Sequence, residues 1–430
     1  MDSTQRPDGP AAETRPTGTT AEDLSPASPA SAAETVGANP RVRDLIDELC
    51  REVGPRPSGS AAEAAAAERL RARLEAWGLP AATERFRTTP FGLQGLLATM
   101  GGCYLLALGV YFVCPYGALS FLGLAILVLL AHRALDLDLP ALFLPAADST
   151  NVHGTLAPAG ERRRTVLFAG HIDSAFRMPL LARASWFPWL SRGMLLFFVS
   201  YLTLLGLSVA RIAAGHVGGG PRGPVEWALL GLCGLGAAFA LLVLGGMIRR
   251  DAVPGANDNL SAVATAWETA RRLATDRPRH VEVRVVAFGS EEAGLKGSRD
   301  FALRHRDELR DAVLVNLESL GQSGRLHVLT GEMLAGARHA PEALRLVEDA
   351  ARDAGIPLAR KYLTHGLTDA ASFSTRGLPA ASLIRLNDAG FLDHYHSPGD
   401  SPEHVREEHL EEAVRLCLAV VSRLDREAAG

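Results

Sequence analysis

The sequence has no excess of positive charge, few aromatic residues and no recognisable cysteine pattern. Its 430 residues include 44 Lys and Arg against 48 Asp and Glu, which gives a formal net charge of -4. Nucleic-acid-binding domains are usually basic with clustered Lys and Arg, so we expect no nucleic-acid partner. The five cysteines are odd in number and widely spaced, which argues against a disulfide framework or a thiolate zinc site.

Residues 1–40 lack hydrophobic periodicity and are rich in Ala, Pro, Thr, Ser and acidic residues. Such a segment cannot bury enough apolar surface to offset the entropy lost on ordering, so we expect a disordered tail. It contains no apolar stretch behind a basic start, and we therefore do not expect it to act as a secretory signal peptide.

Charged side chains are absent from Thr88 to Ala131, a stretch of 44 residues. As a helix, at about 1.5 Å per residue, this stretch is about twice as long as a bilayer core of ~30 Å is thick. A Cys-Pro-Tyr-Gly turn at 114–117 divides it into helical arms at 95–113 and 117–133. A second pair of arms is predicted at 193–210 and 227–248. The sequence thus predicts two transmembrane hairpins, with core helices of a large soluble domain as the alternative.

The residues around the arms indicate how they would sit in a membrane. Trp186, Trp189 and Trp227 lie at the ends of the apolar runs, where amphipathic rings favour the interface. Apart from His132 and Arg133 at the end of the second arm, no charged residue or histidine lies within the four arms, so a transport pathway is not expected. Each hairpin returns the chain to the side it left. Arginines are more numerous on that side than on the other: Arg87, Arg133, Arg192, Arg249 and Arg250 against Arg211 and Arg222. The positive-inside tendency therefore predicts a multi-pass membrane protein with a cytoplasmic catalytic domain.

The segments outside the hairpins alternate between strand and helix patterns. Strands are expected at 83–86, 165–169, 281–288, 312–317 and 380–384, and helices at 60–77, 259–274, 297–305, 341–354 and 403–424. This alternation predicts an α/β fold with a mostly parallel, mixed central sheet flanked by helices. The predicted division of the chain is a tail (1–40), the start of the main domain (41–92), hairpin 1 (93–134), more of the main domain (135–188), hairpin 2 (189–250) and the remainder of the main domain (251–430).

Histidines and carboxylates follow the predicted strands or lie in glycine- or proline-containing loops. They are His171, Asp173, Asp258, Glu291, Glu292, Glu318 and His396. Each alone is typical of an exposed or capping residue. Adjacent carboxylates directly after an apolar strand repel each other, however, and a cation relieves that repulsion. Nitrogen and oxygen ligands suit zinc, with cobalt or manganese as alternatives, and a bridging carboxylate allows two ions.

These residues resemble the M28 metallopeptidases, the co-catalytic zinc aminopeptidase-like group. The similarity runs from Gly54-Pro55-Arg56-Pro57-Ser58-Gly59-Ser60 to His396-Ser397-Pro398-Gly399-Asp400. Its most recognisable segment is Glu291-Glu292-Ala293-Gly294-Leu295-Lys296-Gly297-Ser298, and Thr368-Asp369 belongs to a later motif. The resemblance implies a zinc-exopeptidase-like fold, two zinc ions and hydrolysis of a peptide bond at a chain end.

The resemblance also implies a ligand for each ion. His171 and Glu318 would bind one zinc ion, Glu292 and His396 would bind the other, and Asp258 would bridge both.

Four further residues gain an expected role from the resemblance. Asp173 would orient the ring of the first histidine ligand through its second nitrogen. Glu291 would be the general base, and Tyr395 would help to stabilise the oxyanion. His394 is an alternative to the second histidine ligand, although the family places that ligand directly before a Ser/Thr-Pro pair.

Three features depart from the family pattern. His171 and Asp258 are 87 positions apart, where the family usually places them close, and hairpin 2 fills the gap. Hairpin 1 likewise separates the strand at 83–86 from residues 151–156. We infer that both hairpins are insertions into surface loops of a peptidase core, which would bring the site close to the bilayer and favour hydrophobic or membrane-derived peptides. Glu318 stands where aminopeptidases of the family mostly have Asp.

These observations predict a membrane-anchored zinc-dependent exopeptidase, most simply an aminopeptidase acting on peptides. The Glu at 318 leaves a carboxypeptidase, dipeptidase or amidase open. A glutaminyl-cyclase-like acyltransferase shares the fold and much of the ligand set. A non-catalytic receptor on the same fold would usually lack a ligand or the base, and the sequence lacks neither. The sequence does not predict an oligomeric state.

Overall fold

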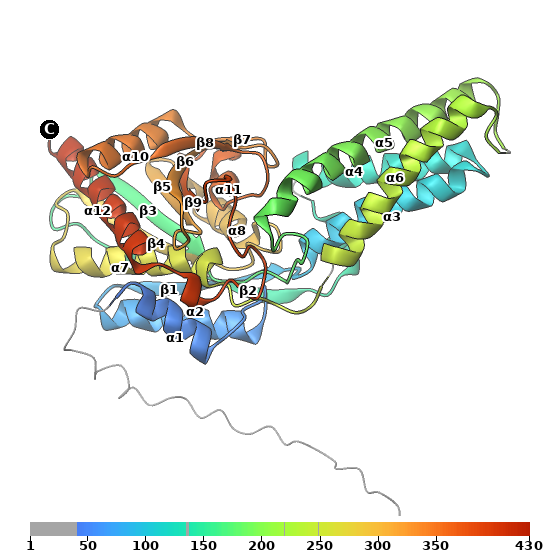
Figure 1. Cartoon of the computed structure of the whole chain (residues 1–430). Helices are drawn as coiled ribbons and strands as arrows, with labels where there is room; N and C mark the ends of the chain where they lie inside the picture. The colour runs from blue at the N-terminus through green and yellow to red at the C-terminus, as the bar shows by residue number, and fades with distance from the viewer. Residues whose placement is uncertain (1–40, 135–136, 219, 248) are drawn as a thin grey trace, which may run out of the picture. The chain divides into compact units, whose positions relative to one another are not determined.

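The computed structural model describes residues 41–134, 137–218, 220–247 and 249–430 (Figure 1). The tail expected at 1–40 lies outside the described residues. Within the described part, an α/β sheet unit and four long apolar helices can be distinguished.

The sheet has nine strands. They are β1 (Ala81–Thr88), β2 (Ala147–Leu156), β3 (Arg164–His171), β4 (Val281–Phe288), β5 (Ala312–Glu318), β6 (Arg325–Glu332), β7 (Ala337–Arg338), β8 (Ala359–Leu363) and β9 (Ala380–Leu386). Their order is β1-β2-β4-β3-β5-β9-β6-β7, with β8 paired to β6. The central strands β4, β3, β5 and β9 are parallel, whereas β1, β2, β6 and β7 add antiparallel pairs. The sheet is therefore mixed with a parallel centre.

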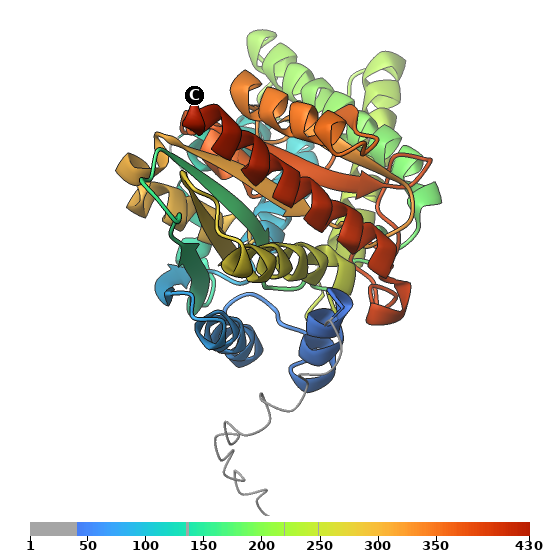
Figure 2. The same cartoon turned by 90° about the vertical axis from the view of Figure 1, so that its left-hand side faces the viewer.

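Helices cover both faces of this sheet. They are α1 (Arg43–Glu52), α2 (Ala61–Ala76), α7 (Ser261–Thr275), α8 (Lys296–Arg304), α9 (Arg306–Leu309), α10 (Pro341–Asp353), α11 (Ala370–Ser374) and α12 (Glu407–Ala429). Alternate residues of β3 face opposite ways, since Val166 and Phe168 belong to the core with α7, α10 and α12, and Leu167 and Ala169 to the core with α8 and α11. Figure 2 shows the helices of the first core in front of the sheet.

The fold class predicted from the sequence is confirmed, and several boundaries differ. The terminal helix begins at Glu407 and not at Glu403, because Pro402–His404 forms a separate 3₁₀ turn, η5. The strands β2, β6, β7 and β8 were not predicted. They are short or carry polar residues, and they lie at or beside the edge of the sheet, so they lack the apolar runs of the central strands.

Four long helices form two consecutive pairs beside the sheet (Figure 1). They are α3 (Gly92–Tyr111), α4 (Pro115–Ala134), α5 (Phe187–Ala213) and α6 (Pro224–Met247). Each is long and apolar enough to cross a membrane. Pro115 and Pro224 begin α4 and α6, at the position where the missing N–H of proline breaks no helical hydrogen bond. The short turn η2 (Leu139–Phe143) follows the first pair, and the short turn η3 (Ala184–Trp186) precedes the second pair.

The second pair extends beyond its predicted arms and so includes ionisable residues. Arg211 is buried near the end of α5, with its guanidinium 3.9 Å from the Glu226 carboxylate of α6. The same guanidinium lies over the Tyr111 ring, 5.1 Å from its centroid. Arg211 and Glu226 thus meet at the end of the helices that is remote from the sheet. Together with Tyr111 they connect α3, α5 and α6 there.

Each helix pair leaves and re-enters the sheet unit at neighbouring points. The first pair lies between β1 and β2, which pair with each other from Ala81↔Gly154 to Thr88↔Ala147. The second pair lies between β3 and α7, and an antiparallel bridge between Phe176 and Ala252 joins the two chain segments at its base. The sheet is therefore continuous across both excursions.

Candidate active site

Three neighbouring parallel strands end with site residues at one edge of the sheet. His171 is the last residue of β3, Glu318 is the last residue of β5, and Glu291 and Glu292 follow shortly after β4. The carboxyl ends of parallel strands meet at the same edge, so the topology brings these side chains together. Ser290 and Ser319, beside them, have φ angles of 52° and 47°, a left-handed conformation that non-glycine residues adopt mainly where the surroundings enforce it.

Two loops bring the remaining predicted residues to this edge. Asp258 lies in an irregular turn, η4 (Ala256–Leu260), directly before α7, and His396 lies in the loop before η5. The carboxylate of Asp400 accepts hydrogen bonds from the backbone N–H groups of Asn257 (2.6 Å) and Asp258 (3.1 Å). Asp400 thus ties the His396 loop to the Asp258 turn.

Asp258 presents one carboxylate oxygen to each histidine. Its Oδ1 lies 3.3 Å from His171 Nε2, and its Oδ2 lies 3.3 Å from His396 Nε2. On the far sides, His396 Nε2 is 3.2 Å from Glu292 Oε1, and His171 Nε2 is 3.8 Å from Glu318 Oε1. All five side chains point into one buried space.

The donor set fits divalent zinc. Two groups with potential ligand atoms within 4.8 Å of one another are His171, Asp258 and Glu318, and Asp258, Glu292 and His396, and a third joins His171 to Glu291 and Glu292. Asp258 Oδ2 and Glu292 Oε1 are buried without a hydrogen-bond partner among the described residues. Buried carboxylate oxygens normally have a partner, and a cation would supply it. The first two groups have the same members as the predicted ligand sets, and the ligand assignment stays a prediction.

The charges of this cluster shift its pKa values. Burial lowers the pKa of His396, but Glu292 and Asp258 outweigh it and raise that pKa to about 10. Burial also lowers the pKa of His171, and nearby carboxylates, first among them Glu291, raise it well above its usual value. Burial raises the pKa of Glu318 to about 8. In the metal-free protein the histidines therefore hold protons where cations would sit.

The predicted base and oxyanion residues also lie at this site. Glu291 Oε2 is 3.8 Å from His171 Nε2, and only 11% of the Glu291 side chain is exposed. Burial raises the pKa of Glu291 well above its usual range. The ring of Tyr395 lies beside that of His396, with centroids 3.8 Å apart. By contrast, His394 is exposed and stacks on His404, so it does not join the cluster.

Known proteins are similar to this chain in sequence over part of its length and in fold. Residues 244–421 match the family model of peptidase family M28. We call this part of the chain the M28 domain, after the family to which it is similar. The matched segment includes the predicted residues from Asp258 to His396, whereas His171 and Asp173 precede it.

A curated relative and several solved structures extend the match. Over 176 residues the chain is 31% identical to aminopeptidase YwaD of Bacillus subtilis (strain 168), which covers 39% of this chain and 37% of that protein. The alignment thus spans well under half of the relative. A zinc aminopeptidase from Bacillus subtilis has a TM-score of 0.54 at 18% identity, over 89% of this chain and 94% of that one. A glutaminyl cyclase from Fimbriiglobus ruber has a TM-score of 0.50 at 17% identity, over 89% and 93%. These structures show that the chain has their fold.

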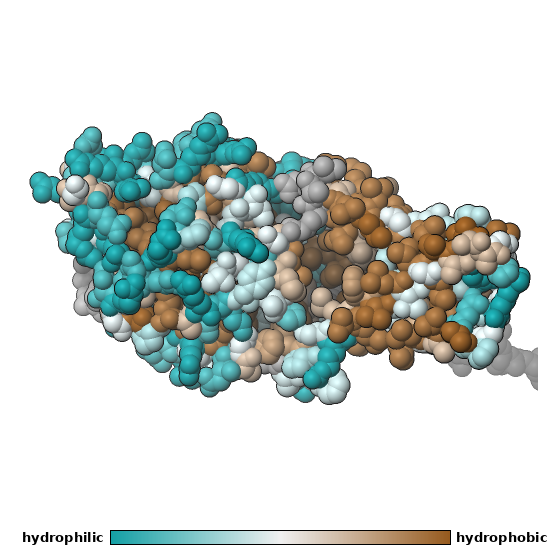
Figure 3. Space-filling view, turned by 90° about the horizontal axis from the view of Figure 1, so that it is seen from above, coloured by the Kyte–Doolittle hydropathy of each residue, from teal (hydrophilic) through white to brown (hydrophobic). Residues whose placement is uncertain are grey.

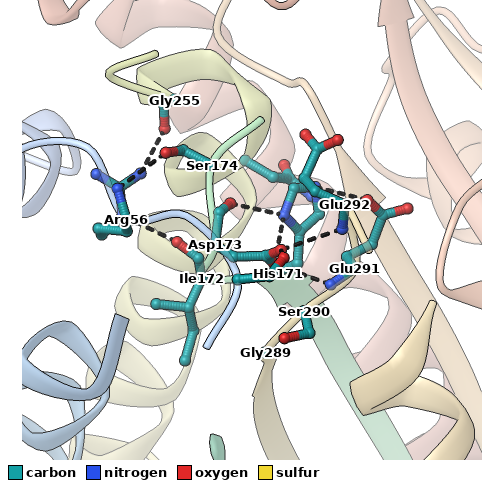
Figure 4. Close-up of polar contacts among 12 residues, drawn as sticks. Arg56, His171, Ile172, Asp173, Ser174, Gly255, Gly289, Ser290, Glu291 and Glu292 are labelled. Carbon is teal, nitrogen blue, oxygen red and sulfur yellow. Dashed lines mark hydrogen bonds and ion pairs between the residues drawn. The ribbon is translucent and has the colours of Figure 1, made fainter. Parts of the chain in front are cut away.

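Asp173 holds the glutamate loop of the M28 domain as well as touching His171. His171 Nδ1 lies 3.0 Å from the backbone oxygen of Asp173 and 3.4 Å from its carboxylate. That carboxylate accepts hydrogen bonds from the backbone N–H groups of Glu291 (2.9 Å) and Glu292 (3.1 Å), as Figure 4 shows, and from Ser58 Oγ (2.6 Å). Asp173 therefore positions the first histidine mainly through its backbone and the two glutamates through its side chain.

Arg56 is a buried residue that sequence reasoning did not assign to the site. Its guanidinium donates hydrogen bonds to the backbone oxygens of Ile172 (2.9 Å) and Gly255 (3.0 Å), as Figure 4 shows. It also donates to the backbone oxygen of Gly54 (2.7 Å). Ile172 follows His171, and Gly255 precedes the turn that carries Asp258. Arg56 thus joins the two segments that lead to these predicted ligands. Its place in the Gly54–Ser60 motif was the available signal.

Glu63 was also missed, because it lies in an Ala/Glu/Arg-rich helix whose other glutamates are mostly exposed. It is fully buried and accepts hydrogen bonds from Gly59 N–H (2.8 Å), Ser149 Oγ (2.9 Å) and Ser290 N–H (2.8 Å). Through Ser290 it supports the strained residue directly before Glu291.

A cavity of about 580 Å³ opens from the cluster toward the long helices. The predicted ligands, Glu291 and Tyr395 line one end, and side chains of α3, α5 and α6 line the other. The M28 domain and the helix pairs therefore share one cavity.

Proposed function

We propose that the chain is a membrane-anchored, zinc-dependent exopeptidase of the aminopeptidase type. The observation that carries this proposal is the pair of His-carboxylate groups that share Asp258, with Glu291 beside them at the end of β4. The M28 domain and its similarity to an aminopeptidase support it.

The proposed ligands of one zinc ion are His171 and Glu318, those of the second are Glu292 and His396, and Asp258 would serve both. When bound, zinc would polarise the scissile carbonyl and lower the pKa of water toward neutrality. Asp400 and Asp173 hold the backbone on which these ligands stand.

Glu291 is the proposed general base. It accepts a proton from the attacking water while the water oxygen bonds to the scissile carbonyl carbon. It then passes that proton to the leaving nitrogen as the carbon–nitrogen bond breaks. The Tyr395 hydroxyl donates a hydrogen bond to the carbonyl oxygen as negative charge develops there. Burial and the neighbouring carboxylates raise the pKa of Tyr395 well above its usual value, which keeps this donor protonated.

The four apolar helices are proposed as a membrane anchor formed by two hairpins inserted into the M28 fold, at 93–134 and 189–250. Arg249 and Arg250 lie on the side of the sheet unit, whereas Arg211, at the other end, is paired with Glu226. The positive-inside tendency therefore favours a cytoplasmic catalytic domain. Protease added to intact cells should leave the domain uncut, and digestion before lysis would place it outside.

The activity is tested with detergent-purified protein and a panel of short peptides that have free amino termini, blocked amino termini or blocked carboxyl termini. We expect hydrolysis wherever the amino terminus is free, and its loss with a chelator. Cleavage of N-blocked peptides alone would make the protein a carboxypeptidase or amidase. Cyclisation of amino-terminal glutamine without hydrolysis would make it a glutaminyl-cyclase-like acyltransferase. Tight zinc binding with neither reaction would favour a receptor.

A further inference from the structure

The cavity has two chemically different ends. At the catalytic end it is lined by carboxylates and histidines, and one flank is formed by loops such as 364–368 that offer backbone groups. At the other end its wall consists of helix side chains that are almost all apolar. Among them are Leu97 and Met100 of α3, Met194 and Phe197 of α5, and Ala240 and Val243 of α6.

The apolar end lies at the depth of the hydrocarbon core if the helices span a bilayer as proposed. Trp189 is 70% exposed at the start of α5, with Arg192 over its ring at 5.2 Å, an arrangement that suits the membrane interface. Phe197 lies eight residues further along α5, which corresponds to about 12 Å of helix. Figure 3 shows hydrophobic side chains around a hollow where the helices meet the rest of the chain.

This wall does not suit an extended peptide backbone. Ser191, a polar residue of α5 in the lining, already donates to the Phe187 oxygen (2.9 Å) and lies 2.8 Å from His365 Nε2. A peptide laid along the helices would leave its N–H and C=O groups without partners, which is unfavourable in an apolar space. The apolar end therefore suits hydrocarbon, and the loop flank suits peptide.

We propose that the apolar end binds a long hydrocarbon chain carried by the substrate residue at the scissile bond. The substrate class is then an amino acid derivative or peptide whose first residue has a free amine and a lipid-like side chain, longer than any natural side chain. The amine and the scissile bond lie at the catalytic end, and the chain lies between α3, α5 and α6.

This inference rests on the proposed aminopeptidase activity. One substrate series distinguishes a failure of the inference from a failure of the proposed activity. The series consists of aminoacyl anilides with linear alkyl side chains of one, four, eight and twelve carbons. Each is assayed in detergent at concentrations below the solubility limit of that substrate. We expect kcat/KM to rise by up to about three- to fourfold per added CH₂, continuing past four carbons. A plateau at four carbons, with the short substrates hydrolysed, would overturn the inference alone. No hydrolysis of any substrate would overturn the proposed function.

Substitutions on α6 test the location of the chain. Val243→Trp fills the apolar end, and we expect it to lower the ratio of kcat/KM for the twelve-carbon substrate to that for the one-carbon substrate by at least about tenfold. Leu242→Trp is the matched control, because Leu242 is 52% exposed on the same helix and does not line the cavity. If Val243→Trp fails to fold, Ala240→Leu makes the same test. An unchanged ratio, or an equal fall in the control, would contradict the assigned position.

Discussion

The Asp173 carboxylate accepts a 2.9 Å hydrogen bond from the backbone N–H of Glu291. It accepts a second from Glu292, so one buried side chain fixes both the proposed base and the ligand beside it. Because Asp173 lies two residues after β3 and the glutamates follow β4, this contact also joins the ends of two adjacent strands.

Replacing Asp173 with Asn would turn an amide N–H₂ toward one of these donors. We expect kcat/KM and zinc affinity to fall by about 10- to 100-fold, as is usual for residues that hold metal ligands. Both quantities are measured on protein with an unchanged thermal transition. Asp148→Asn is the control, since that side chain is 64% exposed, and a similar fall there would contradict the assigned role.

Removing the Arg56 guanidinium would leave three carbonyl groups, two of them buried, without this donor. We expect Arg56→Met to reduce the free energy of unfolding by about 3 kcal/mol, the order of magnitude for such orphaned groups. The zinc content should fall together with the stability. The reason is that the carbonyl of Ile172 adjoins His171 and the carbonyl of Gly255 precedes the turn that carries Asp258. Thermal unfolding in detergent measures the effect, and Arg51→Met, with a 70% exposed side chain, should be neutral.

Phe187 links the long apolar helix α5 to the loop that carries Tyr395. Its ring stacks on Phe391 with centroids 4.5 Å apart and lies 6.4 Å from the Tyr395 ring. We expect Phe187→Ala to lower kcat by about tenfold, because small displacements of a catalytic group are costly. Phe198→Ala, at a residue of the same helix that is 58% exposed, is the control. Equal kcat values in both variants would show that the helix does not position Tyr395.

Zinc binding should compete with protons. The pKa of His396 is raised to about 10, and that of His171 is also raised, so both rings carry protons at neutral pH when no metal is bound. Zinc must displace these protons, and its affinity should therefore rise with pH by up to about tenfold per unit for each proton released. Competition with a chelator of known proton affinity at pH 6, 7 and 8 measures this slope. A flat profile would mean that the rings are already neutral.

Much of the fold was predictable because its signals are local. Apolar runs without charge predicted the long helices, and β4 was predicted from Val281 to Phe288 as observed. The helix ends were less accurate, since α5 begins at Phe187 and continues to Ala213, through residues such as Arg192 that interrupt the apolar run. Strands β2, β6, β7 and β8, which lie at or beside the edges of the sheet, carry no such run and were missed.

The predicted site residues were drawn from strand ends and from a family resemblance, and the structure brings them into one cluster. Apart from Asp173, the residues that support the cluster were not predicted, because their function depends on contacts across the chain. Glu63 contacts Ser290, 227 positions away, and Asp400 contacts Asp258, 142 positions away. A sequence pattern cannot distinguish these buried carboxylates from exposed ones.

The central claim is a pair of zinc ions served by Glu291 as base. The most direct test measures zinc per chain and peptide turnover together, in the wild type and in Glu291→Gln, with Glu408→Gln as an exposed control. We predict about two zinc ions in all three proteins, and a fall in kcat of about 100- to 10,000-fold in Glu291→Gln alone. Fewer than two zinc ions in an active wild type, or an active Glu291→Gln, would contradict the account.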